Sequence, residues 1–206
     1  NTISLNDQLA PVIEQVAEIS TTNNSPTYVF KSDEQGTITV GHASSSALNG
    51  FSPTTISSAE VNTNINLQWT GLAEGTYSGY YINVTDDAGN VSNTLTIPNF
   101  TVDTLGPTVT QTSNITTPSN DNTPSFTFQT TEGGVLTSSL SDGFSAPASY
   151  IDNGVYKANI SQTDTNITFT FNALEDATYT GETITVTDEA GNAGTCILNT
   201  FVVDTV

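Results

Sequence analysis

Two short stretches of the chain place pairs of acidic side chains in the same setting. The stretches are VTDDAGN at residues 84–90 and VTDEAGN at residues 186–192. The acids of these pairs are Asp86, Asp87, Asp188 and Glu189. A tight turn uses an Asp to accept hydrogen bonds from nearby backbone N–H groups, so a purely structural role accounts for one acid in each pair. The second acid, repeated in the second stretch, favours a cation-binding role over a turn alone.

Further acids recur at matched places. Asp7 stands four residues before Pro11, and Asp103 stands four residues before Pro107. Asp204, in the closing FVVDTV, is a third copy of the same position. Other acids fall in a turn between two predicted strands: Asp33 and Glu34 in the first half of the chain, and Glu132 in the second, where Thr131 replaces the first acid.

Several carboxylates held together repel one another unless a cation lies between them. Ca²⁺ accepts about six to eight oxygen ligands in irregular geometry, whereas Mg²⁺ requires stricter octahedral geometry. Softer metals prefer His or thiolate ligands, and this chain has one His and one Cys, both outside these acidic loops. We therefore predict Ca²⁺ as the cofactor. The predicted ligands are Asp7, Asp33, Glu34, Asp86 and Asp87 for a first site, Asp103, Glu132, Asp188 and Glu189 for a second, and Asp204 for a following one.

The acids recur because the whole chain is a tandem repeat. Residues 25–40 match residues 123–138, and residues 65–90 match residues 167–192, with the acids in step. We predict three parts. Residues 1–10 are the tail of a preceding repeat with its linker, residues 11–103 form a first domain, and residues 104–206 form a second domain that includes the start of the next linker. From this division we expect the chain to be a section of a longer tandem array.

Both repeats show the pattern of β-strands. Ile65, Leu67 and Trp69 alternate with polar residues, as do Ile167 and Phe169 in the second repeat, which places one row of side chains against a core. Turn residues interrupt the chain often enough for about seven short strands per repeat, the spacing of a sandwich of two sheets. PVIEQVAEI at residues 11–19 comes nearest to a helical pattern, but its counterpart PTVTQTSNI is typical of a strand, so we predict strands for both. The pattern predicts an all-β fold of two tandem seven-stranded β-sandwiches arranged end to end.

In an Ig-type sandwich the loops after the second and sixth strands lie at the same pole as the incoming linker. Residues 31–36 fall after the second predicted strand, and residues 85–90 fall after the sixth. Three separate elements therefore bring their acids to one pole in each repeat.

Composition excludes several classes of function. Only two of the 206 residues are Lys or Arg, and the formal net charge is −19. Phosphate binding requires clustered basic residues, so neither nucleic acid nor an anionic membrane surface is an expected partner. The sequence has no run of 18 or more apolar residues, so direct membrane insertion is not expected. The chain has a single His, and no motif pairs a nucleophile with a base. We therefore predict that it is not an enzyme, with no catalytic residues and no organic cofactor.

The TDDAGN and TDEAGN turns, each followed by VDT and in the first case by LGP, resemble those of the bacterial Ig-like repeats of giant surface adhesins and biofilm-associated proteins. The resemblance covers both repeats. It implies seven-stranded Ig sandwiches, calcium at the junctions between consecutive domains, and a location outside the cell, at the bacterial surface.

The function expected from these features is a calcium-rigidified spacer, or extender, in a long adhesin that projects a binding tip from the cell surface. Its partners would be the neighbouring repeats of the same chain and a cell-surface or extracellular ligand bound by another region. Two alternatives remain open at this point. One is a structural subunit of an extracellular filament, surface layer or phage fibre, and the other is a carbohydrate-binding accessory module of a secreted enzyme.

Overall fold

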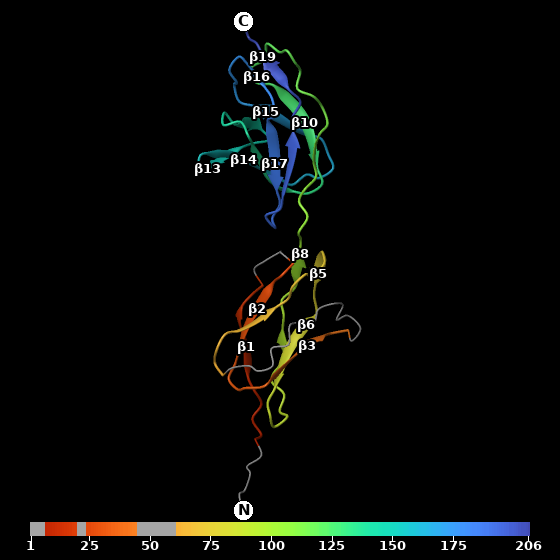
Figure 1. Cartoon of the computed structure of the whole chain (residues 1–206), viewed down its shortest axis with the longest axis vertical. Coiled ribbons are helices and arrows are strands. Elements are labelled where there is room, and N and C mark those ends of the chain that lie inside the picture. Colours follow the sequence, from red (N-terminus) through yellow and green to blue (C-terminus); the bar gives the residue numbers. More distant parts are fainter. Residues whose placement is uncertain (1–6, 20–23, 45–60) are drawn as a thin grey trace, which may run out of the picture. The chain divides into compact units, whose positions relative to one another are not determined.

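The computed structural model describes residues 7–19, 24–44 and 61–206 of the chain (Figure 1). The chain divides into two compact units, Asn1–Thr104 (unit 1) and Leu105–Val206 (unit 2). The sequence placed the boundary one residue earlier, between residues 103 and 104. Every regular element in the described ranges is a β-strand, so the prediction of an all-β chain is confirmed. No helix in these ranges is long and apolar enough to cross a membrane.

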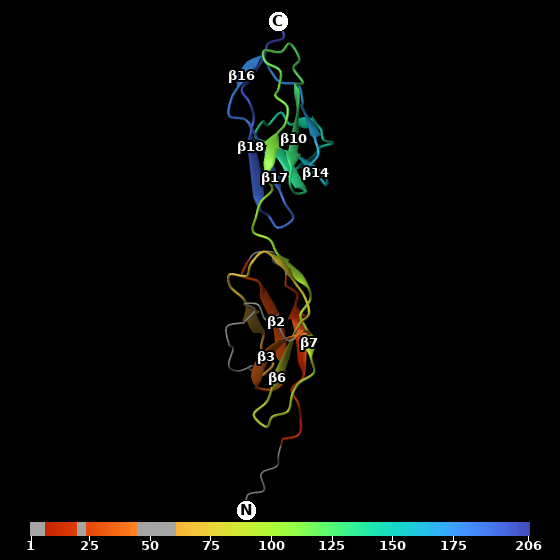
Figure 2. The same cartoon turned by 90° about the vertical axis from the view of Figure 1, so that its right-hand side faces the viewer.

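Unit 1 contains two three-stranded antiparallel sheets among its described residues. The first has the strand order β1 (Ile13–Ala17), β2 (Thr27–Ser32), β4 (Ile65–Gln68). The second has the order β3 (Thr37–His42), β6 (Tyr80–Thr85), β7 (Leu95–Thr96). A short ladder, β5 (Gly75–Tyr77) with β8 (Phe100–Val102), completes the unit. Figure 2 shows β2, β3, β6 and β7 of this unit from a second direction.

The core of unit 1 follows from the alternation in its strands. Tyr28 and Phe30 of β2 are fully buried while their neighbours are partly exposed, and Ile82 and Val84 of β6 behave in the same way. Trp69, just after β4, is also buried, 6.3 Å from Phe100 between ring centroids. Burial of such side chains contributes about 1.5–3 kcal/mol each, which makes this row the main source of stability in the unit.

Unit 2 has the same plan, with more strands than the described part of unit 1. One sheet has the order β12 (Phe144–Ala146), β15 (Ile167–Phe171), β10 (Ser125–Thr130), β9 (Val109–Gln111). The other has the order β13 (Tyr150–Asp152), β14 (Val155–Ile160), β11 (Gly134–Ser138), β17 (Thr183–Thr187), β18 (Ala193–Ile197). The short ladder is β16 (Ala177–Tyr179) with β19 (Phe201–Val203). Its separate core is rich in phenylalanine, including Phe126, Phe128, Phe169 and Phe171.

Among the described residues the strands are more numerous than the predicted seven per repeat, and a glycine explains part of the difference. Gly79 lies between β5 and β6 with a φ of 77°, and Gly181 lies between β16 and β17 with a φ of 75°. A residue with positive φ interrupts the ladder, and glycine adopts this conformation without steric cost. The segments before and after each glycine are therefore separate strands that pair with different partners. Residues 11–19 and 107–115 contain the strands β1 and β9, as predicted, and no helix.

Candidate metal centre

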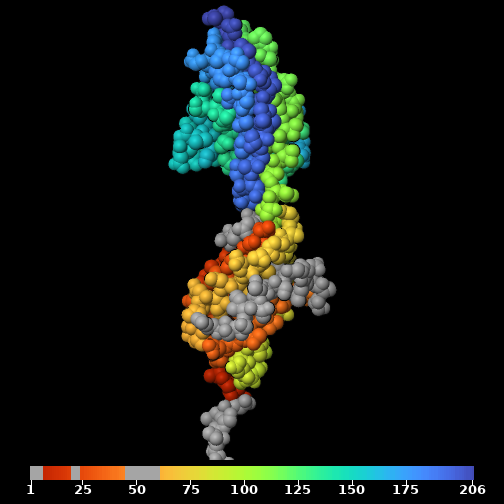
Figure 3. Space-filling view, viewed as in Figure 1, coloured from red at the N-terminus to blue at the C-terminus, as the bar shows by residue number. Residues whose placement is uncertain are grey.

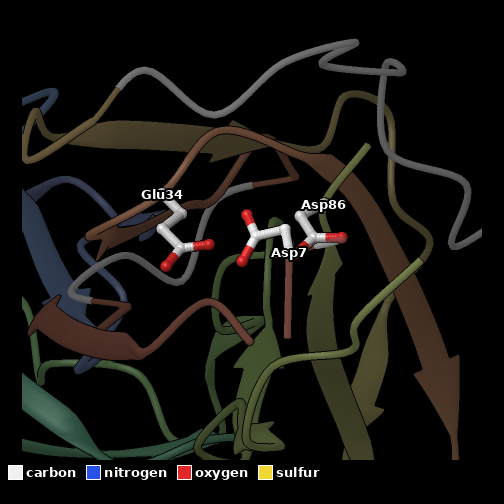
Figure 4. A group of neighbouring side chains, drawn as sticks. All are labelled: Asp7, Glu34 and Asp86. Atoms are coloured by element: carbon white, nitrogen blue, oxygen red, sulfur yellow. The ribbon is translucent and has the colours of Figure 1, made fainter. Parts of the chain in front are cut away.

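Unit 1 brings three acids from three distant parts of the chain to one point (Figure 4). Asp7 precedes β1, Glu34 lies between β2 and β3, and Asp86 follows β6. One carboxylate oxygen from each lies within 4.8 Å of the other two. Glu34 and Asp86 are partly buried and Asp7 is exposed, so the group opens to solvent on the side of the incoming chain.

The turn that carries Glu34 is fixed by a buried hydroxyl. Ser32 is 1% exposed, and its Oγ donates to the backbone carbonyl of Glu34 at 2.6 Å. Two residues later the turn packs closely against the end of β6. A Cβ on Gly36 would lie 2.5 Å from the carbonyl oxygen of Thr85, so only glycine permits this approach. The close packing places Glu34 beside the loop that begins at Asp86.

The loop after β6 is built around Asp86 and Asn90. The backbone N–H of Asn90 donates to Oδ1 of Asp86 at 2.8 Å, and the Asn90 side chain donates to Oδ2 at 2.8 Å. The backbone of Asp86 in turn donates to the carbonyl of Asn90 at 3.1 Å. Gly89 completes the turn with a φ of 92°, a conformation that suits glycine. The turn therefore fixes the Asp86 carboxylate from both ends.

Asn90 also holds the incoming chain. Its side-chain Nδ2 donates to the backbone carbonyl of Asp7 at 3.2 Å, in addition to its bond with Asp86. The Asp7 carboxylate accepts from the backbone N–H of Leu9 at 3.1 Å. In the sequence, Asn90 is simply the last residue of the VTDDAGN turn, a residue type that such turns favour. Its matched place in both TDxAGN stretches is the signal that it organises two of the three acids.

The carboxylates of this group repel one another electrostatically. The pKa of Glu34 is raised above its ordinary value by desolvation first, and then by the negative charges of Asp7, Asp33 and Asp86. Desolvation also acts to raise the pKa of Asp86, but hydrogen bonds from Asn90, Ala88 and Gly89 outweigh it and lower the pKa overall. Asp86 thus stays ionised easily, and its charge and that of Asp7 oppose ionisation of Glu34. A cation among these oxygens would relieve that repulsion.

Unit 2 repeats the same local devices. Glu132 and Asp188 each offer a carboxylate oxygen, and these lie within 4.8 Å of each other. The buried Thr130 replaces Ser32, and its Oγ1 donates to the carbonyl of Glu132 at 2.8 Å. Asn192 donates to Asp188 from its backbone at 2.8 Å and from its side chain at 3.1 Å. The hydrogen bonds that hold Glu132 and Asp188 are therefore the same as those that hold their counterparts in unit 1.

Other predicted ligands are placed differently. Asp33 accepts from the backbone N–H of Val12 at 2.7 Å, so one of its oxygens ties the turn to the residue before β1. Asp87 and Glu189, the second acids of their pairs, are exposed and are not members of these groups. The first acid of each pair both shapes the turn and joins its group. The sequence predicts both acids of each pair as ligands, with a turn role accounting for only one of them.

The two linker acids that follow a final strand stand at equivalent places. Asp103 comes directly after β8, and Asp204 comes directly after β19, where its backbone N–H donates to the carbonyl of Ser119 at 2.9 Å. Asp7 of unit 1 has the same sequence relation to Pro11 as Asp103 has to Pro107.

The donor set in unit 1 consists of carboxylate oxygens, with neither imidazole nor thiolate among the grouped residues. Hard cations with many oxygen ligands, of which Ca²⁺ is the common example, prefer such donors. Partial exposure leaves room for water to complete the coordination shell. The residues present therefore fit calcium better than a softer metal.

Comparison with known proteins gives a likeness of fold alone. No protein-family model matches the chain, and no curated protein matches it. Among solved structures, the chain is similar to the fibronectin(III)-like modules of Clostridium thermocellum CbhA. The sequences are 13% identical, the match covers 94% of each chain, and the TM-score is 0.46. A likeness at this level carries no functional argument.

Proposed function

We propose that the chain is a pair of calcium-binding spacer repeats within a longer extracellular protein, of the kind that holds an adhesive region away from a bacterial surface. The observation that carries the proposal is the group of Asp7, Glu34 and Asp86, in which the linker before the unit and two loops of the unit present their carboxylates to one point. A cation held there would join the linker to the domain that follows it.

The repeat extends this proposal to the second site. Glu132 and Asp188 match Glu34 and Asp86 in sequence and in their local hydrogen bonds. Asp103 matches Asp7, and we propose that it is the linker ligand of the second site, as Asp7 is of the first. Asp204 would serve a following repeat in the same way.

Calcium would make such a chain of repeats stiff. The linker VDTLGP is short, and Pro107 restricts its own φ and the residue before it. Ligands shared between linker and domain would remove much of the remaining freedom. Calcium is abundant outside cells and scarce in the cytosol, so the stiff state would belong to the extracellular location that we propose. The neighbouring repeats are the proposed partners, and another region of the protein would bind the target.

The test is a calcium titration of the chelator-treated protein, followed by thermal melting. A ligand that binds only the folded state at a hundred times its dissociation constant adds about 2.7 kcal/mol per site, so melting temperature should rise with calcium and much less with magnesium. Variant D86N should lose the effect of one site. D87N is the matched control, because it removes the same charge from the adjacent, exposed position outside the group. A parent protein that calcium leaves unchanged, or equal losses in D86N and D87N, would refute the proposal.

A cleft in unit 2 favours a second candidate, carbohydrate binding. The cleft is lined by uncharged residues alone: Pro147, Asn159, Ile160, Ser161, Gln162 and Ile167. The hydroxyl of the exposed Tyr150 donates to the side chain of Asn159, one of the lining residues, at 3.3 Å. Amide and hydroxyl groups beside apolar ones suit a neutral sugar. However, the volume is about 210 Å³, below the roughly 300–1,000 Å³ of typical ligand pockets, so this candidate ranks second.

A further inference from the structure

Thr104, which follows Asp103 at the end of unit 1, is bonded back to its own unit. Its backbone N–H donates to Oε1 of Glu74 at 2.7 Å, and its hydroxyl donates to the same oxygen. Both residues are exposed, so these bonds are not a by-product of core packing. One carboxylate oxygen therefore holds the exit segment by two donors from a single residue.

Unit 2 contains the same arrangement at its own end. The backbone N–H of Thr205 donates to Oδ1 of Asp176 at 3.1 Å, and the Thr205 hydroxyl donates to that oxygen at 2.9 Å. Asp176 occupies the place of Glu74 in the aligned repeats, and Thr205 occupies that of Thr104. Two separately folded units thus form the same bonds with acids of different length, which argues against a chance surface contact.

The loop that carries the acid makes the same two contacts in both units. In unit 1 the Tyr77 hydroxyl donates to the carbonyl of Ala73, next to Glu74, at 2.9 Å. The Tyr77 ring stacks on Phe100 of β8, with centroids 5.1 Å apart and planes 8° from parallel. Tyr179 of unit 2 forms the equivalent hydrogen bond at 2.9 Å and stacks on Phe201 at 5.0 Å. The tyrosine therefore connects the loop that carries the acid to the strand that precedes the threonine.

We propose that Glu74 and Thr104 form an exit latch, which sets the direction in which the chain leaves unit 1 without any help from calcium. Asp176 and Thr205 form the equivalent latch of unit 2. The role of the latch as a stiffening device rests on the proposed spacer function. Glu74 and Thr104 are positioning residues, because they place Asp103 and the linker and are not themselves ligands.

The linker is also held at its far end, by unit 2. A Cβ on Gly194 of β18 would fall within bonding distance of the Pro107 carbonyl oxygen, and one on Gly106 would lie 2.9 Å from the Ala193 carbonyl oxygen. These two glycines let residues 106–107 pack directly on β18. Figure 3 shows this close approach as the green start of unit 2 against the blue strand. Each end of the linker is thus fastened to its own unit by protein contacts, and calcium would act on a segment that is already constrained.

The test measures the distance between the two units without calcium. Cys196→Ser removes the native thiol, and cysteines at the exposed positions Asn66 and Thr168 carry spin labels, one in each unit. In chelator, T104V and E74A should broaden the distribution of label distances relative to the parent, while T104S should reproduce the parent because it keeps the hydroxyl. E74A should also speed amide hydrogen exchange at residue 104 about tenfold, since that N–H loses its acceptor.

The matched control is T205V, which breaks the equivalent bond at the end of unit 2, after the linker and both labelled positions in the sequence. It should leave the distance distribution unchanged. The latch is refuted if T104V and E74A keep the parent's distribution in chelator, or if T205V broadens it equally. Equal melting temperatures of the variants and parent establish that the broadening is not unfolding. The two proposals can fail separately. If calcium does not change the melting temperature of the parent protein, the metal site is refuted. The distance measurements in chelator test the latch whatever the calcium result.

Discussion

The carboxylate of Asp86 accepts two hydrogen bonds from Asn90, one from the backbone and one from the side chain, both at 2.8 Å. The same Asn90 side chain reaches the backbone of Asp7 at 3.2 Å. One neutral residue therefore orients an acid of the loop and the backbone beside an acid of the linker. Asn192 and Asp188 repeat the first part of this relationship in unit 2.

Replacing Asn90 by Ala should weaken calcium binding at the first site although Asn90 is not a predicted ligand. The substitution removes the side-chain bonds to Asp86 and Asp7 and keeps the backbone bond. Loss of groups that orient a metal ligand typically costs about 10- to 100-fold in affinity. Isothermal titration with calcium measures the change, and N93A, which alters another Asn of the same unit outside the TDxAGN turn, is the comparison. An affinity equal to the parent's would show that the turn orients Asp86 without the amide.

Replacing Glu34 by Gln should raise the melting temperature in chelator and abolish part of the rise caused by calcium. Its pKa is raised by desolvation and by the charges of Asp7, Asp33 and Asp86, so the ionised Glu34 opposes folding when no cation is present. Melting with and without calcium checks both effects in one variant. A fall in the chelator melting temperature would show that Glu34 is held by bonds stronger than this repulsion.

Glycines at positive φ in the acidic turns should resist substitution. Gly89 and Gly191 both have a φ of 92°, and a Cβ added at either place would meet no atom within 4 Å, so Ala is opposed by backbone conformation alone. Each substitution should cost about 1–3 kcal/mol in the free energy of unfolding of its own unit. Denaturant unfolding of G89A and G191A, with A88G as a neighbouring change of opposite sense, measures the cost. A cost near zero would mean that the turn rearranges freely.

Truncation of a core aromatic should destabilise one unit and spare the other. Phe171 is fully buried among Phe126, Phe169 and Phe201, and the cores of the two units are separate clusters. F171A should cost about 3–5 kcal/mol in unit 2. Amide exchange resolved by residue should show faster opening in unit 2 with unit 1 unchanged, and equal acceleration in both units would contradict independent cores.

Acid should remove a small stabilising contribution of Asp121. Hydrogen bonds from the backbone N–H and the hydroxyl of Thr123 lower its pKa. A carboxyl whose folded pKa is depressed stabilises the fold above its unfolded pKa of about 3.9, and loses that contribution as pH falls through the folded pKa. The difference in stability between the parent and D121N should therefore shrink below about pH 4. A difference that stays constant from neutral pH down into this acid range would rule out the charge as its cause.

The sequence by itself determined the repeat, the all-β class and the convergence of acids. Alternation of apolar residues over residues 65–69 and 167–171 dictates which face is buried, because side chains on a strand alternate strictly. The matched acids could be assigned to one pole because loop order in an Ig-type sandwich fixes which loops are neighbours. These inferences need only local periodicity and connection order, both of which are written in the chain.

Only the tertiary structure decided which acids of each set come together. Asp86 and Asp87 are adjacent and chemically alike, yet one joins the group and the other faces solvent, since the turn closed by Asn90 points successive side chains in different directions. Asp33 was equally plausible as a ligand, but its carboxylate bonds the Val12 backbone from a separate segment. The bonds between Thr104 and Glu74 could not be predicted either, because they join residues at the ends of different strands at a distance set by the β5–β8 register. Such choices depend on orientation in space, which no periodicity in the sequence records.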